Sequence, residues 1–435
     1  MGYSETNISD LQKSVAPDVY TNIDLDLQPE RFRTELGKNS KLLKSERIKN
    51  LLADPEQVEF FRQLTLMGDP VADAYAALFP KLGFQKARGM LDQALEEGIE
   101  SVEDAPQELI DFIRTMETPP EWLDWEKIAA TAEDARLMWA LVGDIITRVA
   151  FMLTYVNGYQ GLPMIMTGSL STDSAAKRMK ETISTFKLAA LPGALERDGE
   201  AFKSAAKVRV MHAMVRTNLL RKPKHWDYEV YGVPIPQVDQ MGAALNLNYN
   251  LAKMALRRKG PKKGVFSKRE SQSIEMPRYL AYLLGMHDQF LSDDPKQIAE
   301  TWNMCQATLK HKYDDRSRQL NEATIKAYRR HGDSWFDKIY HQLDMRATRF
   351  LYPFVVGKKT AKDMGVEAGI ADALSFTALA IPIVAQFLGL SAIKLLPGGR
   401  QFVDDYAVKK IKQQLEMEGA AEYKTDQDKY RMGAA

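Results

Sequence analysis

Helical periodicity is the feature of this sequence that most constrains its fold. Apolar residues recur at spacings of three and four through most of the chain, and we find no convincing stretch that alternates with a period of two. The periodic stretches are separated by proline-containing breaks at 54–55, 68–70 and 79–80, which predict helices over 38–52, 56–67, 69–79 and 83–98. The sequence therefore predicts an all-α fold.

The predicted organisation is a single helical domain with extensions at both ends. No glycine–serine linker or low-complexity tract divides the chain. Residues 1–35 predict a polar N-terminal arm, residues 36–400 the helical domain, and residues 401–435 an amphipathic helix followed by a polar tail. The N-terminus lacks a basic start followed by an apolar run, so we expect no signal peptide and a cytoplasmic protein.

Three segments bear on membrane association. Residues 137–155 are apolar, but Asp144 and Arg148 lie one turn apart on them, which favours a core helix over a membrane span. Residues 373–393 carry no charge over 21 positions, and they predict a buried or interfacial helix, or a membrane contact. The run 257–269 contains seven basic residues and no acidic one, which is typical of a solvated loop or a contact with anionic lipid.

Composition and missing motifs exclude several functional classes. The formal net charge of +1 gives no long-range attraction to nucleic acid, so we expect no nucleic-acid partner. Cys305 is the only cysteine, which excludes an intramolecular disulfide, thiolate zinc sites and cysteine-held iron–sulfur clusters. The sequence has no phosphate-binding glycine loop, zinc-protease motif or nucleophile elbow. No two of the six histidines lie three or four residues apart, so a local two-histidine metal face is absent.

His212 has a setting that suits a metal-containing cofactor. It lies in a strongly helical stretch in which Val208, His212 and Val215 share one apolar face. Haem needs only one protein ligand, and His212 is the candidate for the iron. Arg209 and Arg216 lie on either side of it, so they are candidates to bind haem propionates. A core histidine bonded to a backbone carbonyl would explain the same spacing.

A preceding helix carries a second group of polar side chains. Arg178, Glu181 and Thr182 are spaced so that all three share one helix face. A guanidinium, a carboxylate and a hydroxyl together could polarise bound oxygen and move a proton. An exposed, salt-bridged face is the alternative, because Lys177, Lys180 and Lys187 are close by. The turn at 191–195 (LPGAL) can return the chain, so that the two helices face each other across a flat ligand.

Taken together, these segments resemble the latex-clearing protein family of rubber oxygenases, which forms a broad family with the fungal mycophenolate-pathway oxygenase. The resemblance covers roughly residues 60–300 and is densest over 178–216. It rests on RMKET at 178–182, PGAL at 192–195, Gly199 and RVMHAMVR at 209–216, with weaker support from GDP at 68–70 and GVPIPQ at 232–237.

The resemblance implies an all-helical, globin-like core that holds haem b and uses O2. It places the axial ligand on His212, the important arginine on Arg178 and the distal threonine on Thr182. Rubber-cleaving members carry a lysine where this chain has Glu181, and we find no match for their distal glutamate in 155–170. Glu181 could supply that carboxylate itself. The missing lysine, together with the missing signal peptide, argues against rubber cleavage as the activity.

The sequence thus predicts a haem b-dependent oxygenase that acts with O2 on an apolar, isoprenoid or lipid-like substrate. Arg178, Glu181 and Thr182 are the predicted catalytic residues, His212 the iron ligand, and Arg209 and Arg216 further cofactor-binding residues. Peripheral membrane contact is expected through 373–393 or 257–269. Two alternatives stay open: a non-catalytic haem-binding sensor or carrier, and a helical membrane-surface scaffold without a cofactor.

Overall fold

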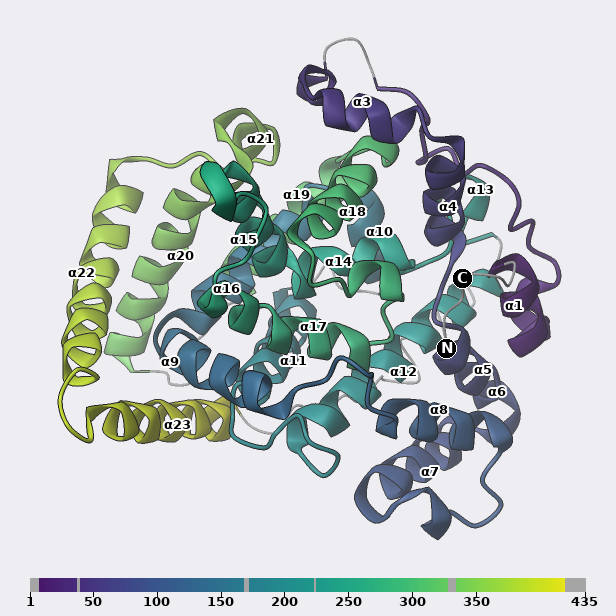
Figure 1. The fold of residues 1–435 in the computed structure, drawn as a ribbon, viewed down its shortest axis with the longest axis horizontal. Coiled ribbons are helices and arrows are strands. Elements are labelled where there is room, and N and C mark those ends of the chain that lie inside the picture. Colours follow the sequence, from purple (N-terminus) through teal and green to yellow (C-terminus); the bar gives the residue numbers. More distant parts are fainter. Residues whose placement is uncertain (1–7, 37–39, 168–171, 223, 328–333, 419–435) are drawn as a thin grey trace. The chain divides into compact units, whose positions relative to one another are not determined.

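The computed structural model describes residues 8–36, 40–167, 172–222, 224–327 and 334–418. Over these residues the backbone forms helices, turns and loops, apart from an isolated β-bridge between Phe32 and Leu309. The all-α prediction is confirmed (Figure 1). The helices predicted from the proline breaks are also present, and the first of them begins later than expected, at Glu46, because the side chain of Ser45 caps it.

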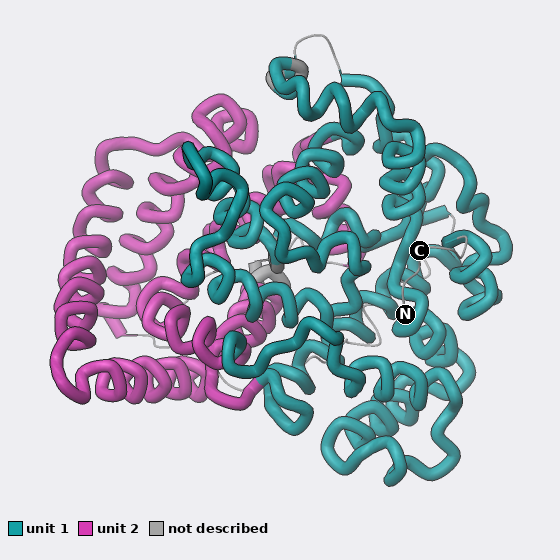
Figure 2. The backbone as a smooth tube through the Cα atoms, in the orientation of Figure 1, with its two compact units in different colours: residues 1–128, 195–310, 425–435 teal, residues 129–194, 311–424 magenta. Residues whose placement is uncertain are grey.

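The chain divides into two compact units, which Figure 2 colours separately. Unit 1 contains residues 1–128, 195–310 and 425–435, and unit 2 contains residues 129–194 and 311–424. Each unit is discontinuous in sequence, and the predicted limits at residues 35 and 400 do not coincide with the boundaries between them. The single domain over 36–400 stays a prediction.

Unit 1 is built mostly from short helices, and capping side chains fix the starts of some of them. Asp54 and Asp69, each followed by proline at the first helical position, accept hydrogen bonds from the backbone of the next turn. The helices are α1 (Ile8–Val15), α2 (Pro17–Tyr20), α3 (Glu46–Leu52), α4 (Pro55–Leu66), α5 (Pro70–Ala77), α6 (Phe79–Leu82), α7 (Phe84–Glu97), α8 (Gln107–Glu117), α12 (Glu200–Leu220), α13 (Tyr228–Tyr231), α14 (Gln237–Ala244), α15 (Asn246–Arg257), α16 (Lys268–Ser273), α17 (Glu275–Leu283) and α18 (Pro295–Thr308).

The N-terminal segment is an integral part of unit 1 over its described residues. Ile8 and Phe32 are buried in the same apolar cluster as Phe61 and Met241. Arg31 is 1% exposed and forms an ion pair of 2.6 Å with Asp239 of α14. The predicted polar arm is therefore corrected: residues 8–32 contribute apolar and charged side chains to the interior, where a solvated arm was expected.

Unit 2 consists of longer helices. These are α9 (Trp125–Tyr155, from Ala129 onward), α10 (Gly158–Met166), α11 (Thr172–Ala189), α19 (Asp315–Ala327), α20 (Trp335–Val356), α21 (Lys358–Asp363), α22 (Ile370–Ile393) and α23 (Gly399–Glu418). One cluster of buried apolar side chains in this unit includes Met152, Tyr155, Leu320 and Tyr352. These come from α9, α19 and α20, so the three helices form the centre of the unit.

Within the described part of the chain, two helices, α9 and α22, are long and apolar enough to cross a membrane by length and composition. In α9, one third of the most apolar stretch is buried, and its charges are paired within unit 2: Asp144 with Lys187 at 2.6 Å and Arg148 with Asp344 at 2.5 Å. In α22 only 6% of that stretch is buried. The expectation that 373–393 forms a buried helix is therefore wrong, whereas an interfacial helix agrees with its exposure.

Candidate functional site

His212 lies in the second half of α12. Most of this helix is buried, but Lys207, Val208, Met211 and His212 are half-buried and share one side. Val215, one turn further on, is buried. The apolar face predicted around the imidazole is therefore present, and it is partly open along its length.

Arg209 and Arg216 form ion pairs with buried carboxylates of unit 1. The guanidinium of Arg209 donates to both carboxylate oxygens of Asp69, at 2.5 and 2.9 Å. Arg216 pairs with Asp73 at 2.9 Å, and neither side chain is exposed. Burial has the largest single effect and lowers the pKa of Arg216, but the charge of Asp73 and its hydrogen bond, together with the charges of Tyr20 and Asp69, raise the pKa above its ordinary value. The contact of these arginines with haem propionates stays a prediction. The ion pairs that the structure contains join α12 to Asp69 and Asp73, at the start of α5.

The weaker motifs of the sequence meet at these ion pairs. Arg216 also donates to the carbonyl of Ile235 at 2.7 Å, which lies in the GVPIPQ segment. The side chain of Gln237 donates to the carbonyl of Gly68 at 2.8 Å, and Gly68 precedes Asp69 in the GDP segment. Segments 68–70 and 232–237 therefore hold α12 in place. Asp69, Asp73 and Gln237 were not among the predicted site residues, although two of them lie in quoted motifs.

Arg178, Glu181 and Thr182 lie on α11, and all three side chains are half-buried. The neighbouring face of α11 is the apolar one, where Met179 and Ile183 pack against Ala323 of α19. The predicted common face of the three polar residues thus lies at the edge of the core of unit 2.

Arg178 is held by a residue that the sequence analysis did not single out. Its guanidinium donates a hydrogen bond of 2.6 Å to the hydroxyl of Thr167, which caps the C-terminal end of α10. Tyr155 lies nearby and is buried. Burial raises the pKa of Tyr155 to about 12, although a hydrogen bond from Thr324 and the charge of Arg178 oppose that rise. The hydrogen bonds of Arg178 and Tyr155 lie beside buried apolar side chains. In such surroundings a hydrogen bond is electrostatically stronger than in water.

The alternative of an exposed, salt-bridged face on α11 holds for only part of the helix. Lys177 is exposed, as that alternative requires. Lys187, however, is fully buried and forms its ion pair with Asp144. Burial of this kind is rare for lysine unless it is paired.

Comparison with protein families decides which family the chain belongs to. Residues 139–385 match the family described as "ER-bound oxygenase mpaB/B'/Rubber oxygenase, catalytic domain", which is more than half of the chain. The protein belongs to this oxygenase family. It is therefore an oxygenase, and the predicted resemblance is confirmed. No curated protein matches the sequence.

Among solved structures, latex clearing protein LCP in its closed state is similar in fold to this oxygenase. The two share 15% sequence identity and a TM-score of 0.53, over 80% of this chain and 91% of the other. At this identity the similarity shows the all-helical fold. The globin-like arrangement of the core stays a prediction.

The predicted site residues of this oxygenase fall in both units. His212, Arg209 and Arg216 belong to unit 1, and Arg178, Glu181 and Thr182 belong to unit 2. All six lie inside the matched range. Stretch 155–170, where no distal glutamate was found, includes α10 and also residues 168–170, which lie outside the described part of the chain. Among the described residues, no group of three histidine, cysteine or acidic side chains is arranged to hold a metal ion.

Proposed function

We propose that this protein is a haem b-dependent oxygenase that acts with O2 on an apolar, isoprenoid or lipid-like substrate. The observation that carries the proposal is the position of His212 on the partly open, apolar face of α12, in a chain that belongs to an oxygenase family. Haem brings four nitrogen ligands of its own, so a single imidazole is a sufficient donor set. When bound, the haem iron supplies the activation of oxygen, and the protein supplies binding, orientation and electrostatics.

The residues of unit 1 would hold the cofactor. His212 would bind the iron, while Val208 and Met211 beside it would help to exclude water from the cofactor. The ion pairs of Arg209 and Arg216 with α5 keep the ligand helix fixed, and a rigid supporting shell keeps an axial ligand in its geometry. We retain both arginines as candidates for propionate contact.

Arg178, Glu181 and Thr182 of unit 2 are the proposed catalytic residues. Arg178, fixed by Thr167, would donate hydrogen bonds to an anionic or polarised oxygen atom. Glu181 would accept a proton, and the hydroxyl of Thr182 would donate or accept one hydrogen bond. Glu181 stands where the rubber-cleaving relatives carry lysine, so we expect a different alkene or lipid-like substrate from rubber. The proposal includes peripheral contact with a membrane, through 373–393 or 257–269.

A visible absorption spectrum with a pyridine haemochrome assay tests the cofactor. The purified protein should show a b-type spectrum, and His212→Ala should lose it while keeping its helical circular dichroism. His225→Ala is the matched control, because His225 is exposed on a loop of the same unit. Full haem content in His212→Ala, or absence of haem from the wild type after supplementation, would refute the proposal.

A further inference from the structure

Helices α20 and α22 form an antiparallel pair at one side of unit 2 (Figure 1). Phe350 of α20 stacks on Phe376 of α22, with ring centroids 5.1 Å apart. Because both helices rise about 1.5 Å per residue, this contact sets the register of the whole pair. It places Arg346 level with Ala380, and Lys338 level with Leu388.

The pair exposes an unusual amount of apolar surface. On α22 the side chains of Ile381, Val384 and Leu388 are 64%, 52% and 62% exposed. The exposed large apolar residues of the two helices and the loop after α22 are Trp335, Phe336, Ile339, Phe354, Val355, Ile370, Leu374, Ile381, Val384, Phe387, Leu388, Leu395 and Leu396. A large exposed apolar surface is typical of sites that contact a protein or a membrane.

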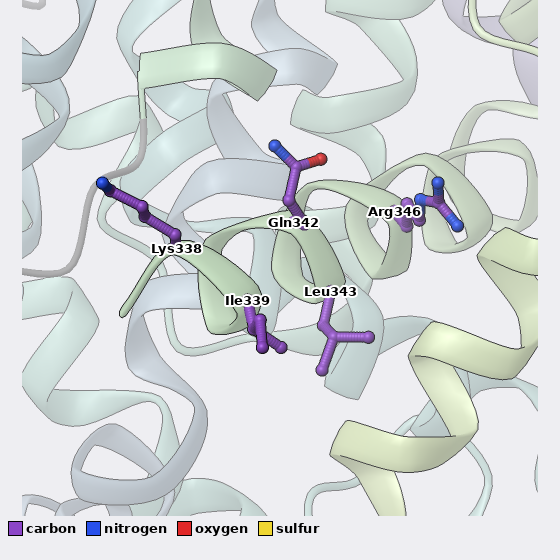
Figure 3. Close-up of a pocket in the computed structure, with 5 residues that line it drawn as sticks. All are labelled: Lys338, Ile339, Gln342, Leu343 and Arg346. Carbon is purple, nitrogen blue, oxygen red and sulfur yellow. The ribbon is translucent and has the colours of Figure 1, made fainter. Parts of the chain in front are cut away.

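Basic side chains lie on the same pair of helices. Lys338 and Arg346 flank a shallow groove of about 260 Å³ on α20, and Ile339 and Leu343 project together between them (Figure 3). Lys338 and Arg346 are exposed, and so is Arg349 one turn beyond. Of the two acidic residues of α20, Asp344 is buried against Arg148 and only Asp337 is accessible. The pair of helices therefore exposes both apolar side chains and positive charge.

We propose that the face formed by α20 and α22 docks in the plane of a membrane surface that contains anionic lipids, with Lys338 and Arg346 binding lipid headgroups. Helices that lie in the interface insert an apolar face and keep basic side chains at headgroup level. The exposed alkyl and aromatic side chains suit the hydrocarbon of the membrane surface, and the cationic groove suits its anionic headgroups. This docking does not depend on the proposed haem chemistry.

The register of the pair argues against α22 crossing the bilayer. If α22 spanned the membrane, α20 would lie beside it, and Arg346 would be level with the centre of α22. A basic side chain at the bilayer centre is strongly unfavourable, and Lys338 and Arg349 would add to that cost. In the plane of the interface, the same three side chains reach the headgroups without entering the hydrocarbon.

The basic run 257–269 lacks the apolar half of such a surface. Val265 is its exposed large apolar residue, and Arg258 is engaged in an ion pair with Glu270. Electrostatic attraction alone gives a weaker and more salt-sensitive contact than attraction combined with apolar insertion. We therefore assign membrane docking to α20 and α22.

Vesicle flotation of the full-length protein tests the docking. One vesicle preparation is phosphatidylcholine alone, and the other contains equal parts of phosphatidylcholine and phosphatidylserine. The wild type should float with both and bind the anionic vesicles more tightly. The triple variant Ile381→Ser, Val384→Ser, Leu388→Ser should lose binding to both. The double variant Lys338→Gln, Arg346→Gln should lose roughly 30-fold in affinity for anionic vesicles only, at about 1 kcal/mol per basic residue.

Matched variants on unit 1 serve as controls. Leu247→Ser, Met254→Ser, Val265→Ser removes exposed apolar side chains of similar exposure, and Lys262→Gln, Lys263→Gln removes two exposed charges. Both controls should bind like the wild type, and circular dichroism should show that all variants fold. The proposal is overturned if the wild type fails to float but forms a dimer that the α22 variant dissociates. It is equally overturned if the unit 1 controls lose binding, or if alkaline carbonate fails to release the protein from vesicles.

Discussion

Glu181 is the proposed proton acceptor, and its role can be tested by a single conservative substitution. The side chain is half-buried on α11, one turn after Arg178. We expect Glu181→Gln to keep the haem and its spectrum while turnover of a lipid-like substrate falls by about 100-fold or more, as is typical when a general base is lost. The change preserves size and hydrogen bonding, so folding should be unaffected. Unchanged turnover in this variant would exclude Glu181 as the proton acceptor.

The neighbouring Lys180→Gln provides the control for that experiment. It lies next to Glu181 on α11 and is likewise half-buried, so it removes a charge without removing the carboxylate. Equal losses in the two variants would indicate a general electrostatic effect instead of proton transfer. Loss of haem in Glu181→Gln would point to a structural role for the side chain.

At the residue scale, the sequence predicted which side chains to examine better than it predicted their partners. The helical spacing correctly placed Val208, His212 and Val215 together on α12. It did not reveal that Arg209 and Arg216 pair with carboxylates that precede them by 140 and 143 residues. Spacing along one helix carries no information about contacts at such separations. Thr167 was missed for the same reason, because its contact with Arg178 depends on how α10 ends.

At the scale of elements, helix limits were predictable wherever a capping residue precedes proline. Asp54-Pro55 and Asp69-Pro70 gave the starts of α4 and α5 to within a residue or two, because an aspartate cap and a first-turn proline both act locally. The exposure of α22 was not predictable, because a run of apolar residues is the same in a core helix and in an interfacial one. The two cases are distinguished by the tertiary packing, in which α22 contacts α20 and, near its C-terminal end, α9 and α23, and leaves most of its apolar side chains exposed.

The turn before Met286 gives a prediction about how α12 is held. Gly285 has a positive φ of 76°, and a Cβ atom there would collide with the side chains of Asp69 and Arg209. We expect Gly285→Ala to destabilise the protein well beyond the roughly 1–2 kcal/mol that a left-handed backbone conformation costs alanine. Urea unfolding measures the loss.

Gly264→Ala isolates the backbone contribution in that experiment. Gly264 has nearly the same φ, 73°, but its nearest neighbour to an added Cβ atom is a carbon of Leu256 at 3.7 Å. This variant should therefore show the backbone cost alone. If Gly285→Ala is as stable as Gly264→Ala, the Asp69–Arg209 ion pair can shift to accommodate the added Cβ atom without loss of stability.

At the scale of the whole molecule, buried tyrosines in both units predict sensitivity to alkali. Burial raises the pKa values of Tyr155 and Tyr352 in unit 2 and of Tyr279 in unit 1 to about 12, from an ordinary value of 10.0. A raised pKa in the folded state means that the neutral form is favoured there, so its stabilising effect is complete below pH 10 and is lost as the pH rises to about 12. Circular dichroism should show unfolding in this range.

Absorbance at the tyrosinate band assigns that transition. The variant Tyr155→Phe, Tyr279→Phe should unfold at a higher pH than the wild type, because two groups that must ionise on unfolding are gone. An unchanged midpoint would show that other groups control alkaline unfolding.

The interleaving of the two units has a consequence for how the protein is made. Residues 129–194 of unit 2 leave the ribosome before unit 1 has received residues 195–310, and unit 2 must then wait for 311–424. Neither unit can therefore be completed while the other is still unsynthesised. Asp69 and Asp73 emerge some 140 residues before the arginines that neutralise them. The yield of folded protein should thus depend on chaperones that protect the long, incomplete nascent chain until both units have been synthesised.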